Sequence, residues 1–197
     1  MNYSEVEASI LRLVTEATED SARAFAERTV TRLVRPELLR AAEDELTEDA
    51  RTALTTGCAN VLMMSAAELH DLLVTIDGGI LADDGLDTGV LTAVTALEHW
   101  KNYLEQNRRG ELCELAVRSI EDIDHEVSAS LDDFLATPEM AAEYARIRRL
   151  LAPGPVCSRP TSPADDPDPA SEGTRTGPPR TVTESVTPTV THLSPGP

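Results

Sequence analysis

Asp122 and His125 are the two residues of this sequence whose types and spacing come nearest to a metal site. Three positions apart on a helix, their side chains share one face, so an Asp-x-x-His unit can present a carboxylate and an imidazole to one ion. Helical bundles that hold two carboxylate-bridged metal ions use such a unit twice, with two further inward carboxylates. Neither His70 nor His99 completes a second unit. The pair is therefore half of a site, and a solvated or hydrogen-bonded histidine is the simpler interpretation.

An acidic segment around residues 77–87 offers oxygen ligands of the kind that Ca²⁺ and Mg²⁺ prefer. Its four carboxylates belong to Asp77, Asp83, Asp84 and Asp87. Their spacing lacks the alternation of an EF-hand loop, so we expect an ordinary solvated turn. In that turn Asp83, Asp84 and Asp87 are candidate contacts for a binding partner.

Trp100 is the only tryptophan of the chain. An exposed tryptophan is a typical anchor of a protein interface, so Trp100 is a candidate partner-binding residue; packing in or beside the core is the alternative. Cys58 and Cys113 lie in apolar helical segments, where buried and inert thiols are expected.

The sequence contains none of the common motifs of catalysis or cofactor binding. No G-x-S-x-G, phosphate-binding loop or G-x-G-x-x-G occurs, so we expect no cofactor and lean against an enzyme. The three cysteines, at positions 58, 113 and 157, form no C-x-x-C pair, and reduced thiols in a cytoplasmic protein fit this pattern best. The first residues predict no signal peptide, and no apolar run is long enough to span a membrane.

The charge of the chain limits its partners. The formal net charge is −18, of which residues 1–152 carry −16 from 14 basic and 30 acidic residues. Such a charge repels phosphate backbones and anionic membranes, so we expect neither nucleic-acid nor membrane binding. It attracts a basic protein partner, although simple solubility is the plainer interpretation of an acidic surface.

Apolar spacing and capping signals predict an all-α fold, a bundle of six or seven helices. Sustained strand alternation is absent, and the short connections favour antiparallel neighbours. The caps expected at helix starts are Ser4, Asp20 or Ser21, Thr47, Asp87 or Thr88, and Thr137 before Pro138. The predicted helices cover residues 4–17, 20–34, 36–46, 47–76 with a kink at Gly57, 87–107, 111–135 and 137–151.

Residues 153–197 differ from the rest in composition. They contain 11 of the 13 prolines and eight threonines, with almost no large apolar side chains. Such a segment cannot bury enough apolar surface to offset its chain entropy. The sequence therefore predicts a helical domain at residues 1–152 and a disordered Pro/Thr-rich tail at residues 153–197.

The region 87–151 resembles the YjaG-like family of uncharacterised bacterial helical proteins. The resemblance rests on apolar spacing and small residues, including Ala93, Ala96-Leu97, Leu115-Ala116-Val117 and the closing Thr137-Pro138-Glu139-Met140. It implies a helical fold in a bacterial protein and brings no catalytic residues.

Two functions remain open from the sequence. The first is a non-enzymatic acidic protein that binds a basic protein partner, as an immunity protein or an inhibitor does, with an association that salt weakens. The alternative is a metal-dependent helical enzyme that uses Asp122 and His125, with Glu68, His70 or the Asp83/Asp84 segment as further ligands. We favour the first because one Asp-x-x-His unit does not complete a site. The partner and the oligomeric state are not predicted.

Overall fold

The fold is given by a computed structural model of the chain, which describes residues 1–39, 42–81 and 85–152. All of these residues lie in one compact unit, bounded at Met1–Cys157. Its seven helices of 12 to 19 residues are α1 (Tyr3–Glu16), α2 (Glu19–Leu33), α4 (Glu48–Asn60), α5 (Ala66–Asp77), α6 (Thr88–Gln106), α7 (Arg109–Val127) and α8 (Pro138–Leu151). Two short turns lie between α2 and α4: the 3₁₀ turn η1 (Pro36–Leu39) and α3 (Ala42–Glu45). The described residues contain no strand, so the all-α prediction is confirmed.

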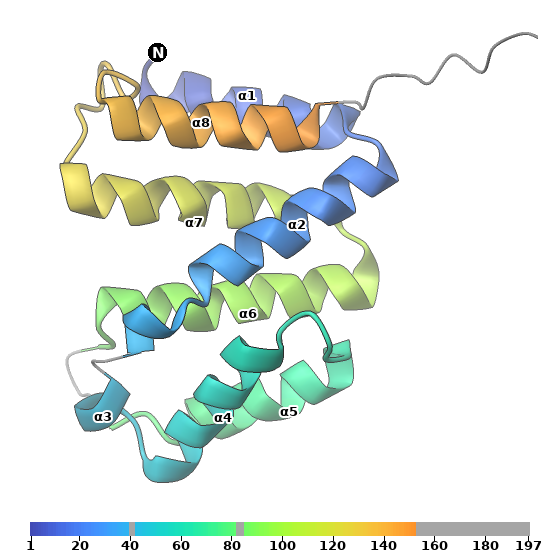
Figure 1. The fold of residues 1–197 in the computed structure, drawn as a ribbon, viewed down its shortest axis with the longest axis vertical. Helices are drawn as coiled ribbons and strands as arrows, with labels where there is room; N and C mark the ends of the chain where they lie inside the picture. Colours follow the sequence, from blue (N-terminus) through green and yellow to red (C-terminus); the bar gives the residue numbers. More distant parts are fainter. Residues whose placement is uncertain (40–41, 82–84, 153–197) are drawn as a thin grey trace, which may run out of the picture. The chain divides into compact units, whose positions relative to one another are not determined.

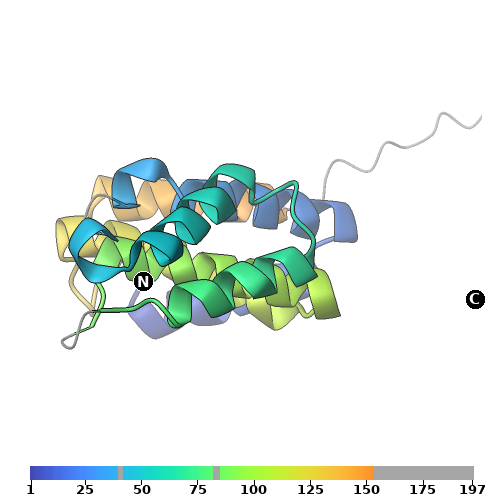
Figure 2. The same ribbon diagram turned by 90° about the horizontal axis from the view of Figure 1, so that it is seen from below.

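The centre of the unit is the antiparallel pair α6 and α7 (Figure 1). Helices α1, α2 and α8 pack on α7, and α2 crosses α6 and α7 obliquely. Helices α4 and α5 form a second antiparallel pair that packs on α6 (Figures 1 and 2). None of the described helices combines the length and the apolar character that a membrane crossing requires. The predicted tail lies outside the described residues, so its disorder stays a prediction.

The helix starts follow the capping rules, although not always at the predicted residue. Thr47 and Thr137 cap α4 and α8 as expected, with Pro138 in the first turn. The first helix begins earlier than predicted, because Asn2 and not Ser4 forms the capping box with Glu5. Thr18 replaces the expected cap at Asp20 or Ser21 and accepts a hydrogen bond from the Ser21 amide. In both cases a side-chain acceptor slightly upstream satisfies the first amides of the helix.

The predicted helix 47–76 is wrong as a single element. It is divided into α4 and α5, and the second half begins at a capping box between Ser65 and Glu68. Gly57 does not produce a kink: a Cβ at this position would lie 3.3 Å from Leu97 and 3.4 Å from Leu72, so the glycine allows α4 to pack closely on its neighbours. The turn at residues 61–65 lets both halves bury an apolar face, which one straight helix cannot do.

The predicted helix 111–135 is also shorter than expected. Helix α7 ends at Val127 because Ser128 adopts a left-handed conformation (φ 52°) and the Asp124 carboxylate accepts a hydrogen bond from the Ala129 amide at 2.7 Å. Phe134 is therefore a loop residue, yet it is buried, with its ring edge-on to Tyr3 at 5.1 Å. Asn107 supplies the left-handed residue (φ 49°) that ends α6.

A short backbone clasp closes the α3–α5 region. The Thr47 amide donates to the Gly79 carbonyl at 2.8 Å, and the Leu81 amide donates to the Glu45 carbonyl at 2.8 Å. Gly79 is required here because a Cβ would lie 2.5 Å from the Ala50 Cβ and would also overlap the Thr47 hydroxyl. The predicted helix 36–46 is reduced to η1 and α3, and this clasp holds the chain that follows α3 in place.

Candidate functional site

Asp122 lies in a cluster of charged side chains between α2, α7 and α8. We call this the charge cluster and define it by its six members: Thr29, Arg32, Ser119, Asp122, Glu143 and Arg146. The Arg32 guanidinium donates to Glu143 at 2.6 Å, to Asp122 at 3.1 Å and to the Ser119 carbonyl at 3.2 Å. One side chain of α2 is thereby bonded to both α7 and α8.

Glu143 is the centre of the charge cluster, with 5% of its side chain exposed. Its carboxylate accepts two hydrogen bonds from Arg146, at 2.7 and 2.8 Å, and one from the Ser119 hydroxyl. Burial by itself raises the pKa of Glu143, but the hydrogen bonds from Arg146 and Ser119 and the charges of Arg32 and Arg146 outweigh it. The pKa of this carboxyl therefore lies below its ordinary value, and the group is ionised near neutral pH.

The charge cluster has the properties of a structural joint, that is, a set of polar contacts that fixes how three helices pack. The oxygens of Glu143 are taken by Arg32, Arg146 and Ser119, and Arg146 also bonds the Thr29 hydroxyl at 3.3 Å. A buried carboxylate surrounded by donors in this way is a fixed charge, not a base with a free lone pair. Its effect is to hold α2 in register on α7 and α8.

The metal ligands proposed from the sequence are not brought together. The Asp122 carboxylate is 8% exposed and pairs with Arg32 at 3.1 Å and Arg35 at 3.2 Å. His125, one turn further along α7, is exposed. Within residues 1–39, 42–81 and 85–152, no three His, Cys, Asp or Glu side chains are grouped so that they could hold a metal ion. The Asp-x-x-His unit thus remains half of a site.

Trp100 is buried completely, which corrects its assignment as an interface anchor. Its indole N–H donates to the Val61 carbonyl at 2.9 Å, and the Arg23 guanidinium lies 4.9 Å from the ring centroid. The indole thus provides a hydrogen-bond donor for the backbone carbonyl at the C-terminal end of α4. Because the ring lies in the core, a partner protein cannot reach it without local unfolding.

The acidic candidates have local roles where they can be described. Asp87 is the N-cap of α6: its carboxylate accepts from the Gly89 amide at 2.8 Å, and its own amide donates to the Glu45 carboxylate. Asp83 and Asp84 lie outside the described residues. The partner-binding role of all three stays a prediction.

The histidine of α6 and the two cysteines of the helical domain each have a local structural explanation. His99 lies 2.8 Å from the Glu111 carboxylate, across the junction of α6 and α7. Burial raises the pKa of the Cys58 thiol to about 12 and also raises that of Cys113. Both thiols are therefore protonated and poor nucleophiles at neutral pH, as expected of inert cysteines in apolar surroundings.

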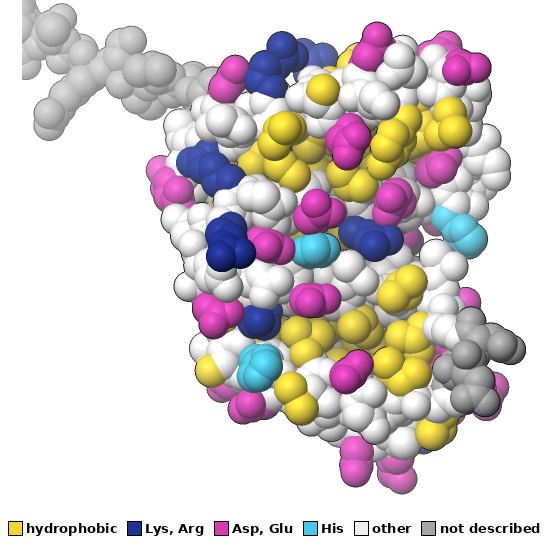
Figure 3. Space-filling model, turned by 180° about the vertical axis from the view of Figure 1, so that it is seen from behind, with side chains coloured by type: hydrophobic (Ala, Val, Ile, Leu, Met, Phe, Trp, Pro, Cys, Tyr) yellow, Lys and Arg dark blue, Asp and Glu magenta, His cyan; other side chains and the backbone are white. Residues whose placement is uncertain are grey.

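A groove between α5 and α6 was not anticipated from the sequence. It encloses about 360 Å³, and we call it the α5–α6 groove; it is lined by His70, Leu73, Val74, Asp77, Val94, Glu98 and Lys101. Val74 is 58% exposed. Ile80 and Leu81, which follow α5 in the chain, and Leu91 of α6 are exposed apolar side chains as well. Viewed from behind, hydrophobic side chains gather over the lower part of the molecule, where α5 and α6 lie, with carboxylates among them (Figure 3).

A signal for this groove was present in the composition of α5. Leu69 and Ile76 are buried and face the core, but Leu72, Leu73 and Val74 add apolar groups around more than one face. A helix with a single buried stripe does not need them. An apolar excess on a helix of a soluble domain indicates either a second packing face or a binding surface.

Comparison of the chain with protein-family models, curated proteins and solved structures finds no match. The resemblance to the YjaG-like family therefore stays a prediction.

Proposed function

We propose that this chain is a non-enzymatic interaction protein that binds a basic protein partner through the α5–α6 groove. The observation that carries the proposal is a groove that combines Leu73, Val74 and Val94 with Asp77 and Glu98, on a domain of net charge −16. Lys101 also lines the groove, but it pairs with Glu105 at 3.5 Å. Apolar contacts with Leu73, Val74 and Val94 supply affinity, and the acidic rim and surroundings select a partner of opposite charge.

The partner segment that fits best is an amphipathic basic helix. Two neighbouring antiparallel helices with a shallow apolar seam between them are the surface on which a third helix packs. A groove of about 360 Å³ accommodates a few aliphatic anchor side chains spaced one turn apart. Lysine and arginine on the flanks of that helix then meet the carboxylates of the rim.

The strong negative charge suits the role of an immunity protein or an inhibitor of a nucleic-acid-binding protein. The basic surface with which such a partner binds phosphates is attracted to an acidic domain. Attraction of this kind raises the association rate and weakens as salt rises.

The first test uses a defined helical peptide with leucines on one face and lysines on the others. Its affinity for the full chain is measured by fluorescence anisotropy against a scrambled peptide of equal composition. Val74→Asp places a charge in the apolar lining of the groove. Leu11→Asp is the matched control, because Leu11 is a helix residue of α1 with 57% exposure against 58% for Val74.

We expect the amphipathic peptide to bind more tightly than the scrambled one, and Val74→Asp to weaken that binding about tenfold or more while Leu11→Asp leaves it within about twofold. Equal binding of both peptides, or equal loss in both variants, would overturn the proposal. In lysate, the captured protein must be basic, must dissociate at moderate salt and must be lost with Val74→Asp alone.

The metal-dependent enzyme gains no specific support as a second candidate. The carboxylate it needs, that of Asp122, is held between Arg32 and Arg35. A cation would have to displace two guanidinium groups to reach it.

A further inference from the structure

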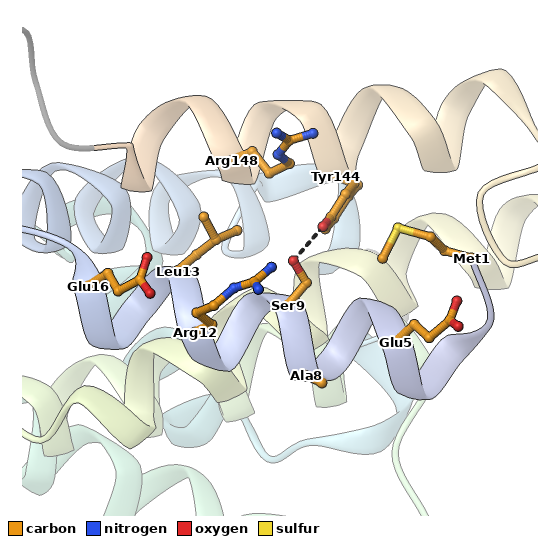
Figure 4. A pocket seen from close by; sticks show the side chains of 9 residues that line it. All are labelled: Met1, Glu5, Ala8, Ser9, Arg12, Leu13, Glu16, Tyr144 and Arg148. Carbon is orange, nitrogen blue, oxygen red and sulfur yellow. Dashed lines mark hydrogen bonds between the residues drawn. The ribbon is translucent and has the colours of Figure 1, made fainter.

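A second groove lies between α1 and α8 and differs from the α5–α6 groove in its chemistry. It has a volume of about 760 Å³, and we call it the α1–α8 groove; its lining residues are Met1, Glu5, Ala8, Ser9, Arg12, Leu13, Glu16, Tyr144 and Arg148 (Figure 4). A volume of this order suits a small organic molecule.

Polar groups of the two helices meet at the middle of the α1–α8 groove. The Tyr144 hydroxyl donates to the Ser9 hydroxyl oxygen at 2.6 Å, so the hydrogen of Ser9 is left for another acceptor. The tyrosine is 7% exposed and is thereby a rigid part of the floor. This hydrogen bond is the dashed line of Figure 4.

Each helix places an arginine about one turn beyond its hydroxyl residue: Arg12 follows Ser9, and Arg148 follows Tyr144. Because α1 and α8 run in the same direction, both guanidinium groups lie on the same side of the Ser9–Tyr144 hydrogen bond (Figure 4). Arg148 also makes a cation–π contact with the Tyr144 ring: its guanidinium carbon lies 5.8 Å from the ring centroid.

Neither arginine of the groove is neutralised by a described carboxylate, a state that Arg28, Arg108 and Arg149 share, but of these arginines only Arg12 and Arg148 line a groove together. Among the described residues, carboxylates pair with the arginines at positions 23, 32, 35, 109, 118 and 146. No described carboxylate pairs with Arg12 or Arg148, although two glutamates line the same groove. Glu5 is engaged in the cap of α1, and in Figure 4 Glu5 and Glu16 lie towards opposite ends of the groove.

We infer that the α1–α8 groove binds a small organic oxyanion, a carboxylate or a phosphate, between Arg12 and Arg148. Guanidinium groups form two-pronged hydrogen bonds with both classes of oxyanion, and the Ser9 hydroxyl adds a third donor. Leu13 and Ala8 offer an apolar wall to the remainder of the molecule. The site is independent of the proposed partner surface on α5 and α6.

The test measures the thermal unfolding of the full chain with sodium phosphate or sodium succinate, each against sodium chloride at the same ionic strength. A ligand that binds the folded state raises Tm, and general screening is equal in all three salts. Phosphate also stabilises proteins by exclusion from their surface, so binding is read from the rise in Tm that Arg12→Gln removes. Isothermal titration calorimetry then gives Kd for the better anion. The variants are Arg12→Gln and Arg148→Gln, with Tyr144→Phe as a third.

The matched control is Arg149→Gln, which removes the same charge from the exposed neighbour of Arg148 on α8. We expect at least one of the two anions to raise Tm above the chloride value, and each groove variant to weaken Kd by about tenfold while Arg149→Gln leaves it within about twofold.

A preference for phosphate or for succinate identifies the class of oxyanion. No rise in Tm with either anion, or equal weakening by Arg149→Gln, would overturn the assignment. Val74→Asp changes the α5–α6 groove and leaves the α1–α8 groove intact. Loss of anion binding and loss of peptide binding are therefore separate outcomes, and one proposal can fail while the other holds.

Discussion

Removal of the Glu143 carboxylate tests whether the charge cluster stabilises the fold. Glu143→Ala leaves Arg32 and Arg146 without the oxygens that they now contact at 2.6 to 2.8 Å. Breaking a buried ion pair from one side costs about 3 to 5 kcal/mol. In the variant, Arg32 keeps its bond to Asp122, and the side chains of Arg32 and Arg146 are already about one-fifth exposed. We therefore expect a loss of stability at the lower end of this range, about 3 kcal/mol.

The control is Glu126→Ala, which removes the same charge at the edge of this region. Glu126 is 61% exposed and lies 3.8 Å from Arg35, so its loss is expected to cost less than about 1 kcal/mol. Urea unfolding is followed by far-UV circular dichroism and by the fluorescence of Trp100, the only tryptophan and a buried one. The lower stability of Glu143→Ala corresponds to a Tm about 6 to 12 °C below that of the parent chain.

The pH dependence supplies a second readout. The pKa of Glu143 is lowered in the folded state, so its contribution to stability is present above the ordinary value of 4.5 and is lost as pH falls through the folded-state pKa. The parent chain should therefore lose more stability on acidification than Glu143→Ala does. If Glu143→Ala costs no more than Glu126→Ala and keeps the parent's acid sensitivity, the assignment of the charge cluster as a stabilising joint is refuted.

Three further predictions concern single sites. Gly79→Ala should destabilise the fold by about 1 to 3 kcal/mol in urea unfolding, because its Cβ meets Ala50, whereas Gly110→Ala, with open space around it, should be neutral or stabilising by up to about 1 kcal/mol; equal effects would contradict the close approach. Ser65→Ala should lower stability by about 1 kcal/mol through loss of the α5 cap, and an unchanged urea midpoint would argue against that cap. In a Cys157→Ser variant, burial should protect Cys58 from a thiol reagent at pH 8 until urea unfolds the chain, and rapid labelling of the folded protein at this residue would contradict its raised pKa.

The helix boundaries show which features of the fold can be predicted from local sequence patterns. The starts of α4 and α8 and the end of α8 at Leu151 follow from a cap, a first-turn proline and apolar spacing within a few residues. The division between α4 and α5 is not predicted, although Ser65 and Glu68 form a capping box, because apolar residues at helical spacing continue through it. The end of α7 at Val127 depends on Asp124 bonding the Ala129 amide, and side-chain periodicity does not contain this information.

The candidate sites were harder to predict from the sequence than the fold. Asp122 was selected for its spacing to His125, but its actual partners, Arg32 and Arg35, are about 90 residues away in the chain. Trp100 was ambiguous between surface and core, since both environments suit an indole, and the Val61 carbonyl decides for the core. Both grooves lie between two helices. The apolar excess of α5 indicates an extra apolar face, but it does not identify the helix that completes the groove.

Composition, charge and helical periodicity were enough to establish an acidic, all-helical domain, because hydrogen bonds and apolar spacing within a helix depend on neighbours a turn away. Which helix faces meet was decided only by the tertiary structure. Packing brought Arg32 to Glu143 across 111 positions, placed Arg12 and Arg148 in the lining of one groove and buried Trp100. Such contacts depend on the simultaneous burial of many apolar faces, and the pattern of one segment does not specify the segment that will cover it.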